Sequence, residues 1–72
     1  MGDFIVILVT AGAPEEAERI ATALVTEQLA ACVNVVGPVQ SVYRWDGGVQ
    51  RDREMLLVIK TRAALLDRKS VV

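Results

Sequence analysis

The sequence predicts an α+β fold, in which an antiparallel sheet carries its helices on one face. Three features point to it. Residues 4–9 form an uncharged, mostly β-branched run, residues 14–30 repeat apolar side chains at helical spacing, and two strand-like segments flank a glycine-rich turn at residues 46–48. A chain of 72 residues makes one domain at most, so we expect a single domain over residues 1–72.

The first two elements follow from local pattern. The run FIVILV at residues 4–9 is typical of a strand buried on both faces, so we expect it in the centre of its sheet. After a short turn, Pro14 suits the first position of a helix, where its missing N–H is not needed. Glu15 and Glu16 place negative charge at the positive end of the helix dipole. The apolar spacing predicts a helix from about Pro14 to about Ala30.

The middle of the chain predicts a long hairpin. A strand over residues 33–45 is interrupted at Gly37 and Pro38, which indicate a bulge or bend. Residues 46–48 (DGG) predict the turn, because glycine adopts the positive φ that tight hairpin turns require. The returning strand, residues 49–61, is polar near the turn and apolar near its end. We therefore expect a hairpin with a polar tip and a buried base.

The last segment predicts a second helix over residues 62–69, with Thr61 as its N-cap. The resulting order β-α-β-β-α contains five of the six elements of a ferredoxin-like split β-α-β unit, and the sixth is a strand. In that arrangement the first strand lies between the third strand and the missing one. We therefore expect residues 4–9 to have one edge that this chain does not pair.

Composition limits the class of protein. Hydrophobic residues make up 53% of the chain, a large share for its length, and this excess favours burial between subunits. The net charge of −1 gives no electrostatic reason to expect nucleic acid or an anionic membrane as partner. A single cysteine cannot form an internal disulfide, and the N-terminus shows no basic signal-peptide region. We therefore expect a cytoplasmic oligomer.

Four motifs resemble the CutA family of small trimeric proteins associated with divalent-cation tolerance. They are LVT ending the first strand, LAACVN before the second, SVYRWDG at the hairpin and E..LL.IKT on the returning strand. The resemblance spans residues 4–66. It implies a ferredoxin-like fold, a homotrimer built through sheet edges and long hairpins, and an architecture similar to that of PII signalling proteins. It also implies a role in tolerance of divalent metal ions such as copper.

The chain departs from the family pattern in ways that bear on metal binding. The family's C-terminal HPY and PE segments are absent, and Val9 stands where some members carry cysteine. The chain has no histidine. The only cysteine, Cys32, has two readings: a small buried hydrophobe with a protonated thiol, which we favour, or a soft ligand for a copper ion. One cysteine cannot complete a four-ligand zinc site within a subunit.

Other candidate residues lie on the predicted hairpin and its base. Asp46, Asp52 and Glu54 could meet at a trimer axis, although exposed hairpin carboxylates are usually solvated. Tyr43 and Trp45 share one face of the strand, as interface anchors or as a stacking platform in a cleft between subunits.

Lys60 suits an anion in such a cleft, or else extends its amine into water from a packed stem. The chain has no histidine for a catalytic triad and too few glycines for a phosphate loop, so we expect no enzyme. A role in metal tolerance is the main hypothesis. A PII-like sensor for a small anionic metabolite and a purely structural assembly module are the alternatives.

Overall fold

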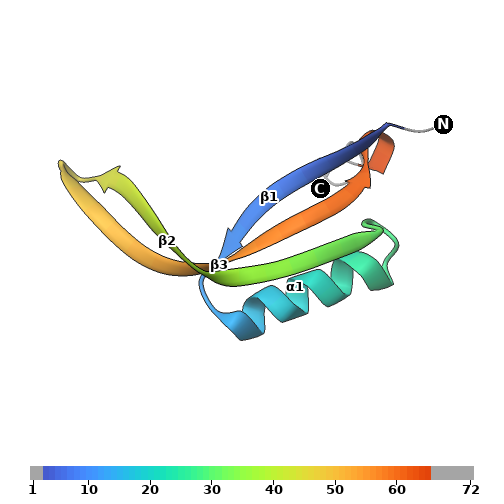
Figure 1. The fold of residues 1–72 in the computed structure, drawn as a ribbon, viewed down its shortest axis with the longest axis horizontal. Coiled ribbons are helices and arrows are strands. Elements are labelled where there is room, and N and C mark those ends of the chain that lie inside the picture. Colours follow the sequence, from blue (N-terminus) through green and yellow to red (C-terminus); the bar gives the residue numbers. More distant parts are fainter. Residues whose placement is uncertain (1–2, 66–72) are drawn as a thin grey trace.

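A computed structural model describes residues 3–65 of the chain. The predicted order of strands and helix is confirmed, and so is the α+β ferredoxin-like class. Residues 63–65 are helical, and the rest of the predicted second helix lies outside the described residues. The elements are β1 (Phe4–Ala11), α1 (Pro14–Thr26), β2 (Cys32–Trp45) and β3 (Gly48–Arg62) (Figure 1).

The three strands form one antiparallel sheet in the order β1-β3-β2. Ile59 in the central strand β3 pairs with Ile7 of β1 and with Val33 of β2. Within residues 3–65 the outer edge of β1 has no paired strand, as the ferredoxin-like order predicts. No helix in this part of the chain is long and apolar enough to cross a membrane.

Helix α1 packs on one face of the sheet, and the β2–β3 hairpin extends beyond it as an arm (Figure 1). The described molecule is therefore elongated, 44 × 24 × 22 Å. The core lies between α1 and β3. Ala17 of the helix and Leu57 of the strand are both 0% exposed, because alanine lets the helix backbone approach the sheet closely. Ala11, Ala21, Ala30 and Ile59 complete the buried cluster.

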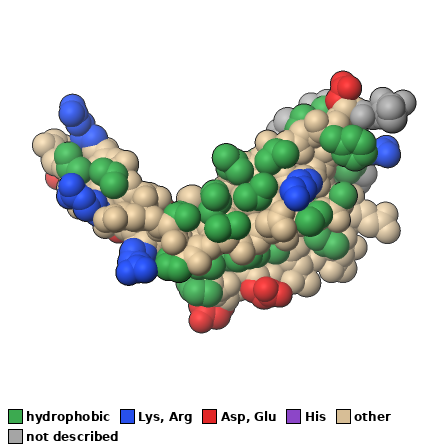
Figure 2. All heavy atoms as spheres, viewed as in Figure 1, with side chains coloured by type: hydrophobic (Ala, Val, Ile, Leu, Met, Phe, Trp, Pro, Cys, Tyr) green, Lys and Arg blue, Asp and Glu red, His purple; other side chains and the backbone are tan. Residues whose placement is uncertain are grey.

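The expectation that the first strand is buried on both faces is wrong for the single chain. Ile7 packs against the core, whereas Phe4, Val6 and Leu8 are 65%, 60% and 65% exposed. The physical reason is that α1 covers one face of the sheet and no described segment covers the other. Figure 2 shows hydrophobic side chains gathered on the surface along β1 and the adjoining sheet.

Helix α1 ends at Thr26, four residues before the predicted end at Ala30. Gln28 adopts a left-handed conformation with φ of 61°. The Gln28 N–H donates to the carbonyl of Val25 at 3.0 Å, and the Leu29 N–H donates to the carbonyl of Leu24 at 2.9 Å. This is a Schellman motif, which satisfies the last helical carbonyls and turns the chain toward β2.

The hairpin has the predicted bulge and turn. Pairing shifts register between Val36 and Val39, at the predicted position of Gly37 and Pro38. Asp46 (φ 55°) and Gly47 (φ 79°) form the two-residue turn, and the residues on either side of it, Trp45 and Gly48, pair with each other. Positive φ at both central residues is the geometry that an Asp-Gly hairpin favours.

Thr61 does not cap a helix, contrary to the prediction. It belongs to β3, is 1% exposed, and donates from Oγ1 to the carbonyl oxygen of Leu29 at 2.6 Å. The hydroxyl therefore ties the segment after α1 to the central strand. A threonine that precedes helix-forming residues can cap a helix or donate its hydroxyl to a carbonyl elsewhere in the chain, and the local sequence is the same in both cases. Here the carbonyl of Leu29, which is distant in sequence, accepts the hydrogen bond.

Candidate functional site

The sheet face that α1 leaves uncovered exposes several large apolar side chains, among them Phe4, Val6 and Leu8, and we call it the open face. Side chains alternate between the two faces of a strand, so the strand pairing identifies the members of each face. Val6, Lys60 and Cys32 form one cross-strand row of the open face. The other members are Phe4, Leu8, Thr10, Asn34, Val36, Leu56, Val58 and Arg62.

The open face continues onto the arm, which comprises residues 39–54. The register shift sets two residues of β2, Gly37 and Pro38, against Met55 alone on β3. The alternation of β3 is unbroken through this point, so Glu54 lies on the same side as Leu56. The side chains that continue the open face along the arm are Val39, Ser41, Tyr43, Trp45, Gln50, Asp52 and Glu54.

The two sides of the arm carry opposite charge. Asp52 and Glu54 lie on the side that continues the open face. Arg44, Arg51 and Arg53 lie on the reverse side, and all three are exposed. This segregation follows from the sequence RDRE at residues 51–54, because alternating charges on a strand point to alternating faces.

Tyr43 interacts with one of these carboxylates. Its hydroxyl donates a hydrogen bond to Oδ2 of Asp52, which lies diagonally across the hairpin. This hydrogen bond raises the pKa of Tyr43 above its ordinary value of 10.0, and desolvation and the negative charges of Asp52 and Glu54 act in the same direction. The phenol is therefore held protonated beside an acidic cluster, and the interaction fixes its ring on the arm.

Cys32 is exposed, so the favoured prediction of a buried cysteine is wrong for the single chain. It begins β2 on the open face, directly opposite Lys60. Lys60 lies 28 positions away in the sequence, so only the strand pairing shows that it is a neighbour of Cys32. Within residues 3–65 no three His, Cys, Asp or Glu side chains lie close enough together to hold a metal ion. Asp46, Asp52 and Glu54 are therefore not a metal centre of one chain.

Tyr43, Trp45 and Lys60 share the open face but do not meet within one chain. Trp45 is 69% exposed at the arm tip, and Tyr43 pairs with Gln50. Gln50 and Lys60 are ten positions apart on β3, which at about 3.3 Å per residue places them roughly 33 Å apart along the strand. A site that used the aromatic residues together with Lys60 would therefore need two copies of the chain.

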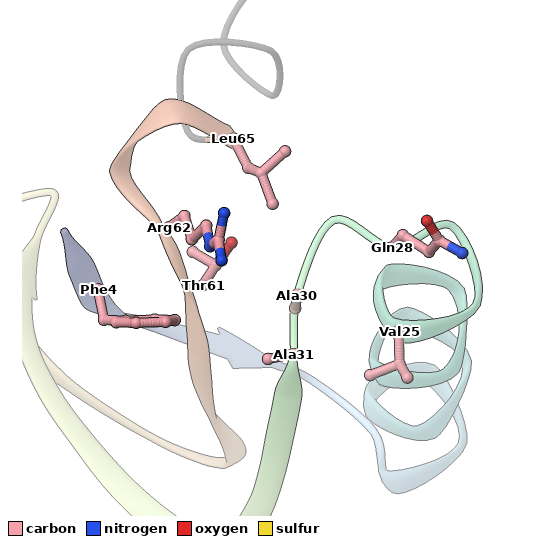
Figure 3. Close-up of a pocket in the computed structure, with 8 residues that line it drawn as sticks. All are labelled: Phe4, Val25, Gln28, Ala30, Ala31, Thr61, Arg62 and Leu65. Atoms are coloured by element: carbon pink, nitrogen blue, oxygen red, sulfur yellow. The ribbon is translucent and has the colours of Figure 1, made fainter. Parts of the chain in front are cut away.

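A cavity of about 390 Å³ lies at the end of the sheet farthest from the arm (Figure 3). Phe4, Val25 and Leu65 contribute apolar walls, and Gln28 and Arg62 contribute polar groups. The guanidinium carbon of Arg62 lies 5.5 Å from the centroid of the Phe4 ring, within cation–π range. Sequence reasoning missed this cavity because it depends on α1 ending at Thr26, which the apolar periodicity did not reveal.

The fold places this chain in the ferredoxin-like α+β class, as its order of elements, its strand order and its projecting hairpin show. The open face of its sheet is apolar and exposed. The family model of the CutA1 divalent ion tolerance protein matches residues 5–71. The chain belongs to the CutA1 divalent ion tolerance family, as the four sequence motifs predicted.

Relatives of established name support this assignment. The chain is 52% identical over 63 residues to the chloroplastic protein CutA 1 of Oryza sativa, covering 88% of this chain and 36% of that protein. It is 54% identical over 56 residues to the divalent-cation tolerance protein CutA of Thermus thermophilus, covering 78% of this chain and 54% of that protein. The chain thus spans from about a third to about half of these relatives' length.

Solved structures agree with the fold. The CutA1 structure from Oryza sativa superposes with a TM-score of 0.88 at 51% identity, covering 90% of this chain and 60% of that one. The CutA1 structure from Thermus thermophilus superposes with a TM-score of 0.86 at 46% identity, covering 90% of this chain and 63% of that one. Each solved chain is longer than the region it shares with this one.

Proposed function

We propose that this chain is a subunit of a homotrimer that acts in cellular tolerance of divalent metal ions and has no catalytic activity. The open face carries the proposal of assembly, because Phe4, Leu8 and Trp45 are each at least 65% exposed. Contiguous apolar surface of this kind marks an interaction site. The names of the Thermus and Archaeoglobus relatives, divalent-cation tolerance protein CutA, support the physiological role.

Metal contact in this proposal depends on assembly. The described residues of one chain do not fit a metal site, because no three of their His, Cys, Asp or Glu side chains lie close enough together to hold a metal ion. Copies of Cys32 brought together by a rotation axis would supply soft thiolate ligands, which favour copper over harder ions. We therefore expect copper to bind between subunits and not to bind a single subunit.

Calorimetric titration of the assembled protein with Cu(I), under reducing conditions, tests the metal proposal. We expect saturable binding that is lost in Cys32→Ser and retained in Thr22→Ser, a matched hydroxyl change on the exposed side of α1. Zn²⁺ serves as the ion comparison, and we expect it to bind more weakly. Undiminished copper binding by Cys32→Ser would remove Cys32 from the proposal.

A second candidate is a PII-like sensor that binds a small anion in the clefts between subunits. It is supported by the shared orientation of Tyr43, Trp45 and Lys60 on the open face. A solved structure of CutA from Synechococcus elongatus, a relative of this chain, is complexed with a Bis-Tris molecule. Titration with a panel of anionic metabolites separates this candidate, since Lys60→Met is expected to abolish anion binding and leave copper binding intact.

The third candidate is an assembly module without a ligand, and Trp45 tests its assembly component. Burying a large exposed aromatic side chain at an interface stabilises association. We expect Trp45→Ala to weaken assembly by roughly 2 kcal/mol or more. Sedimentation equilibrium measures this change. An intact trimer that has lost ligand binding would instead place Trp45 in a binding cleft.

We also propose a cytoplasmic location, on the basis of the single cysteine. Relatives carry other assignments in their names, chloroplastic for the rice protein and periplasmic for the Archaeoglobus structure. Fractionation of the source cells with an antibody against the chain decides the question, and recovery outside the cytoplasmic fraction would refute it.

A further inference from the structure

The reverse side of the arm, opposite the open face, carries basic side chains and no acidic one among its paired residues. Its members are Gln40, Val42 and Arg44 of β2 and Val49, Arg51 and Arg53 of β3. The three arginines are exposed, and none of their side chains forms an ion pair or a hydrogen bond with another residue of 3–65. Figure 2 shows Lys and Arg side chains along the arm. The reverse side is therefore a concentrated positive surface.

The three arginines form one continuous line. Arg51 and Arg53 are two positions apart on β3, so about 7 Å separates them along the strand. Arg44 pairs with Val49 across the hairpin, which makes it the diagonal neighbour of Arg51, and diagonal neighbours lie about 7–8 Å apart. The line thus has a nearly even spacing. Side chains at every second position of an extended peptide have the same spacing, about 7 Å.

Apolar side chains lie beside this line. Val42 is 60% exposed and pairs with Arg51, and Val49 is 56% exposed and pairs with Arg44. A hollow of about 290 Å³ lies at the base of the arm, and its lining residues are Pro38, Val39, Gln40 and Arg53. A ligand laid along the reverse side would therefore meet aliphatic surface as well as positive charge.

This combination favours the carboxylates of a protein over the phosphates of a nucleic acid. Arginine binds carboxylates through two parallel hydrogen bonds, and the methylene groups of a glutamate side chain can lie against the two valines. Single-stranded nucleic acid is held by stacking its bases on aromatic side chains. The aromatic residues of the arm, Tyr43 and Trp45, lie on the other side.

We propose that the reverse side of the arm binds an extended, glutamate-rich segment of a different protein. Carboxylates at alternate positions of that segment pair with Arg44, Arg51 and Arg53, and their methylene groups cover Val42 and Val49. The inference goes beyond the proposed function, because the partner is not a copy of this chain and binds the side of the arm opposite the open face.

Fluorescence anisotropy with a labelled eight-residue peptide of alternating Glu and Thr tests the proposal on the protein in its natural length and assembly. We expect saturable binding that weakens as NaCl is raised from about 0.05 M to about 0.3 M. Arg51→Glu is expected to raise the dissociation constant at least about tenfold. Arg19→Glu, an equal charge reversal at an exposed position of α1, is the matched control and is expected to change it less than about twofold.

Two comparison ligands test the chemistry of the partner. A peptide of the same composition with its glutamates in one block is expected to bind several-fold more weakly, because half of its carboxylates point away from the line when it is extended. An eight-nucleotide oligothymidine is expected to bind more weakly than the alternating peptide. Tighter binding of the oligonucleotide, lost in Arg51→Glu, would assign the surface to nucleic acid and overturn the proposal.

Sedimentation separates this proposal from the proposed assembly. We expect Arg51→Glu to keep the mass of the unchanged protein while it loses the peptide. A change of mass in Arg51→Glu would mean that the reverse side holds subunits together, and the proposal would be wrong. No peptide binding up to about 1 mM, or equal losses in Arg51→Glu and Arg19→Glu, would also overturn it. A monomeric unchanged protein that binds the peptide would refute the assembly alone.

Discussion

Gln28 and Tyr43 show how much of this structure depends on single side chains. Gln28 ends α1 by taking a left-handed backbone conformation, a position at which glycine is the common residue. Tyr43 is held on the arm by its hydrogen bond to Asp52. Both residues act on local geometry, so their substitution is expected to change a measurable local property while the fold is retained.

At Gln28 we expect replacement by glycine to stabilise the protein. A non-glycine residue in the left-handed region carries a steric penalty that glycine lacks, and the greater freedom of glycine in the unfolded chain offsets part of the gain. The free energy of unfolding is expected to rise by about 0.5–1 kcal/mol in urea titration at fixed protein concentration. Gln28→Ala is the control and gains nothing. A glycine variant no more stable than the alanine variant would contradict the steric argument.

At Tyr43 we expect the phenol to ionise at higher pH than in the unfolded chain. The raised pKa means that the folded state holds this proton more tightly, so its contribution to stability is present below pH 10 and is lost as pH rises through the folded-state pKa. Tyr43 is the only tyrosine, so tyrosinate absorbance reports it directly. Asp52→Asn removes the charge and is expected to lower the midpoint. An unchanged midpoint would show that Asp52 does not hold the proton.

Among the elements, the β2–β3 hairpin depends on a close contact at its bulge. A Cβ atom added at Gly37 would lie 2.8 Å from Sδ and 3.2 Å from Cα of Met55. The Met55 side chain would have to move away from the added atom, and the Met55 backbone would have to shift by a few tenths of an ångström. Glycine at this position therefore lets the bulge form while Met55 packs against the core.

We expect Gly37→Ala to destabilise the protein by about 1–3 kcal/mol through this overlap. Gly48→Ala is the matched control on the same hairpin, because its added Cβ would meet no atom closer than 3.8 Å. Urea midpoints of the two variants measure the difference. Equal midpoints would mean that Met55 and the bulge relax without penalty.

At the scale of the whole molecule, α1 and three strands cover only part of their own apolar surface. One face of the sheet and the outer edge of β1 have no covering segment within residues 3–65. Unpaired apolar edges promote association with other chains. An exposed apolar face and an unpaired strand edge of this kind favour contact with a continuing segment or with other copies.

A chain that ends at Val72 is expected to be insoluble or to associate non-specifically through β1 when it is expressed alone. Extension by about 35 residues, enough for the rest of a helix, a strand and a closing segment, is expected to give a soluble oligomer of defined mass. Light scattering after size-exclusion chromatography distinguishes the two. A soluble 72-residue chain that unfolds cooperatively would contradict this prediction, and its measured mass would tell whether a second copy covers the β1 edge.

The sequence by itself determined the order of elements, the Asp-Gly turn, the bulge at Gly37 and the family. These features depend on short-range chemistry, such as strand alternation, positive φ at the turn and the N-terminal proline of α1. Tertiary structure alone decided that α1 ends at Thr26, that Thr61 bonds to Leu29, and that Cys32 faces outward beside Lys60. Each of these outcomes depends on which segments distant in sequence meet. An apolar run such as residues 4–9 predicts a strand buried on both faces. It does not predict whether the segment that covers each face belongs to the same chain or to another.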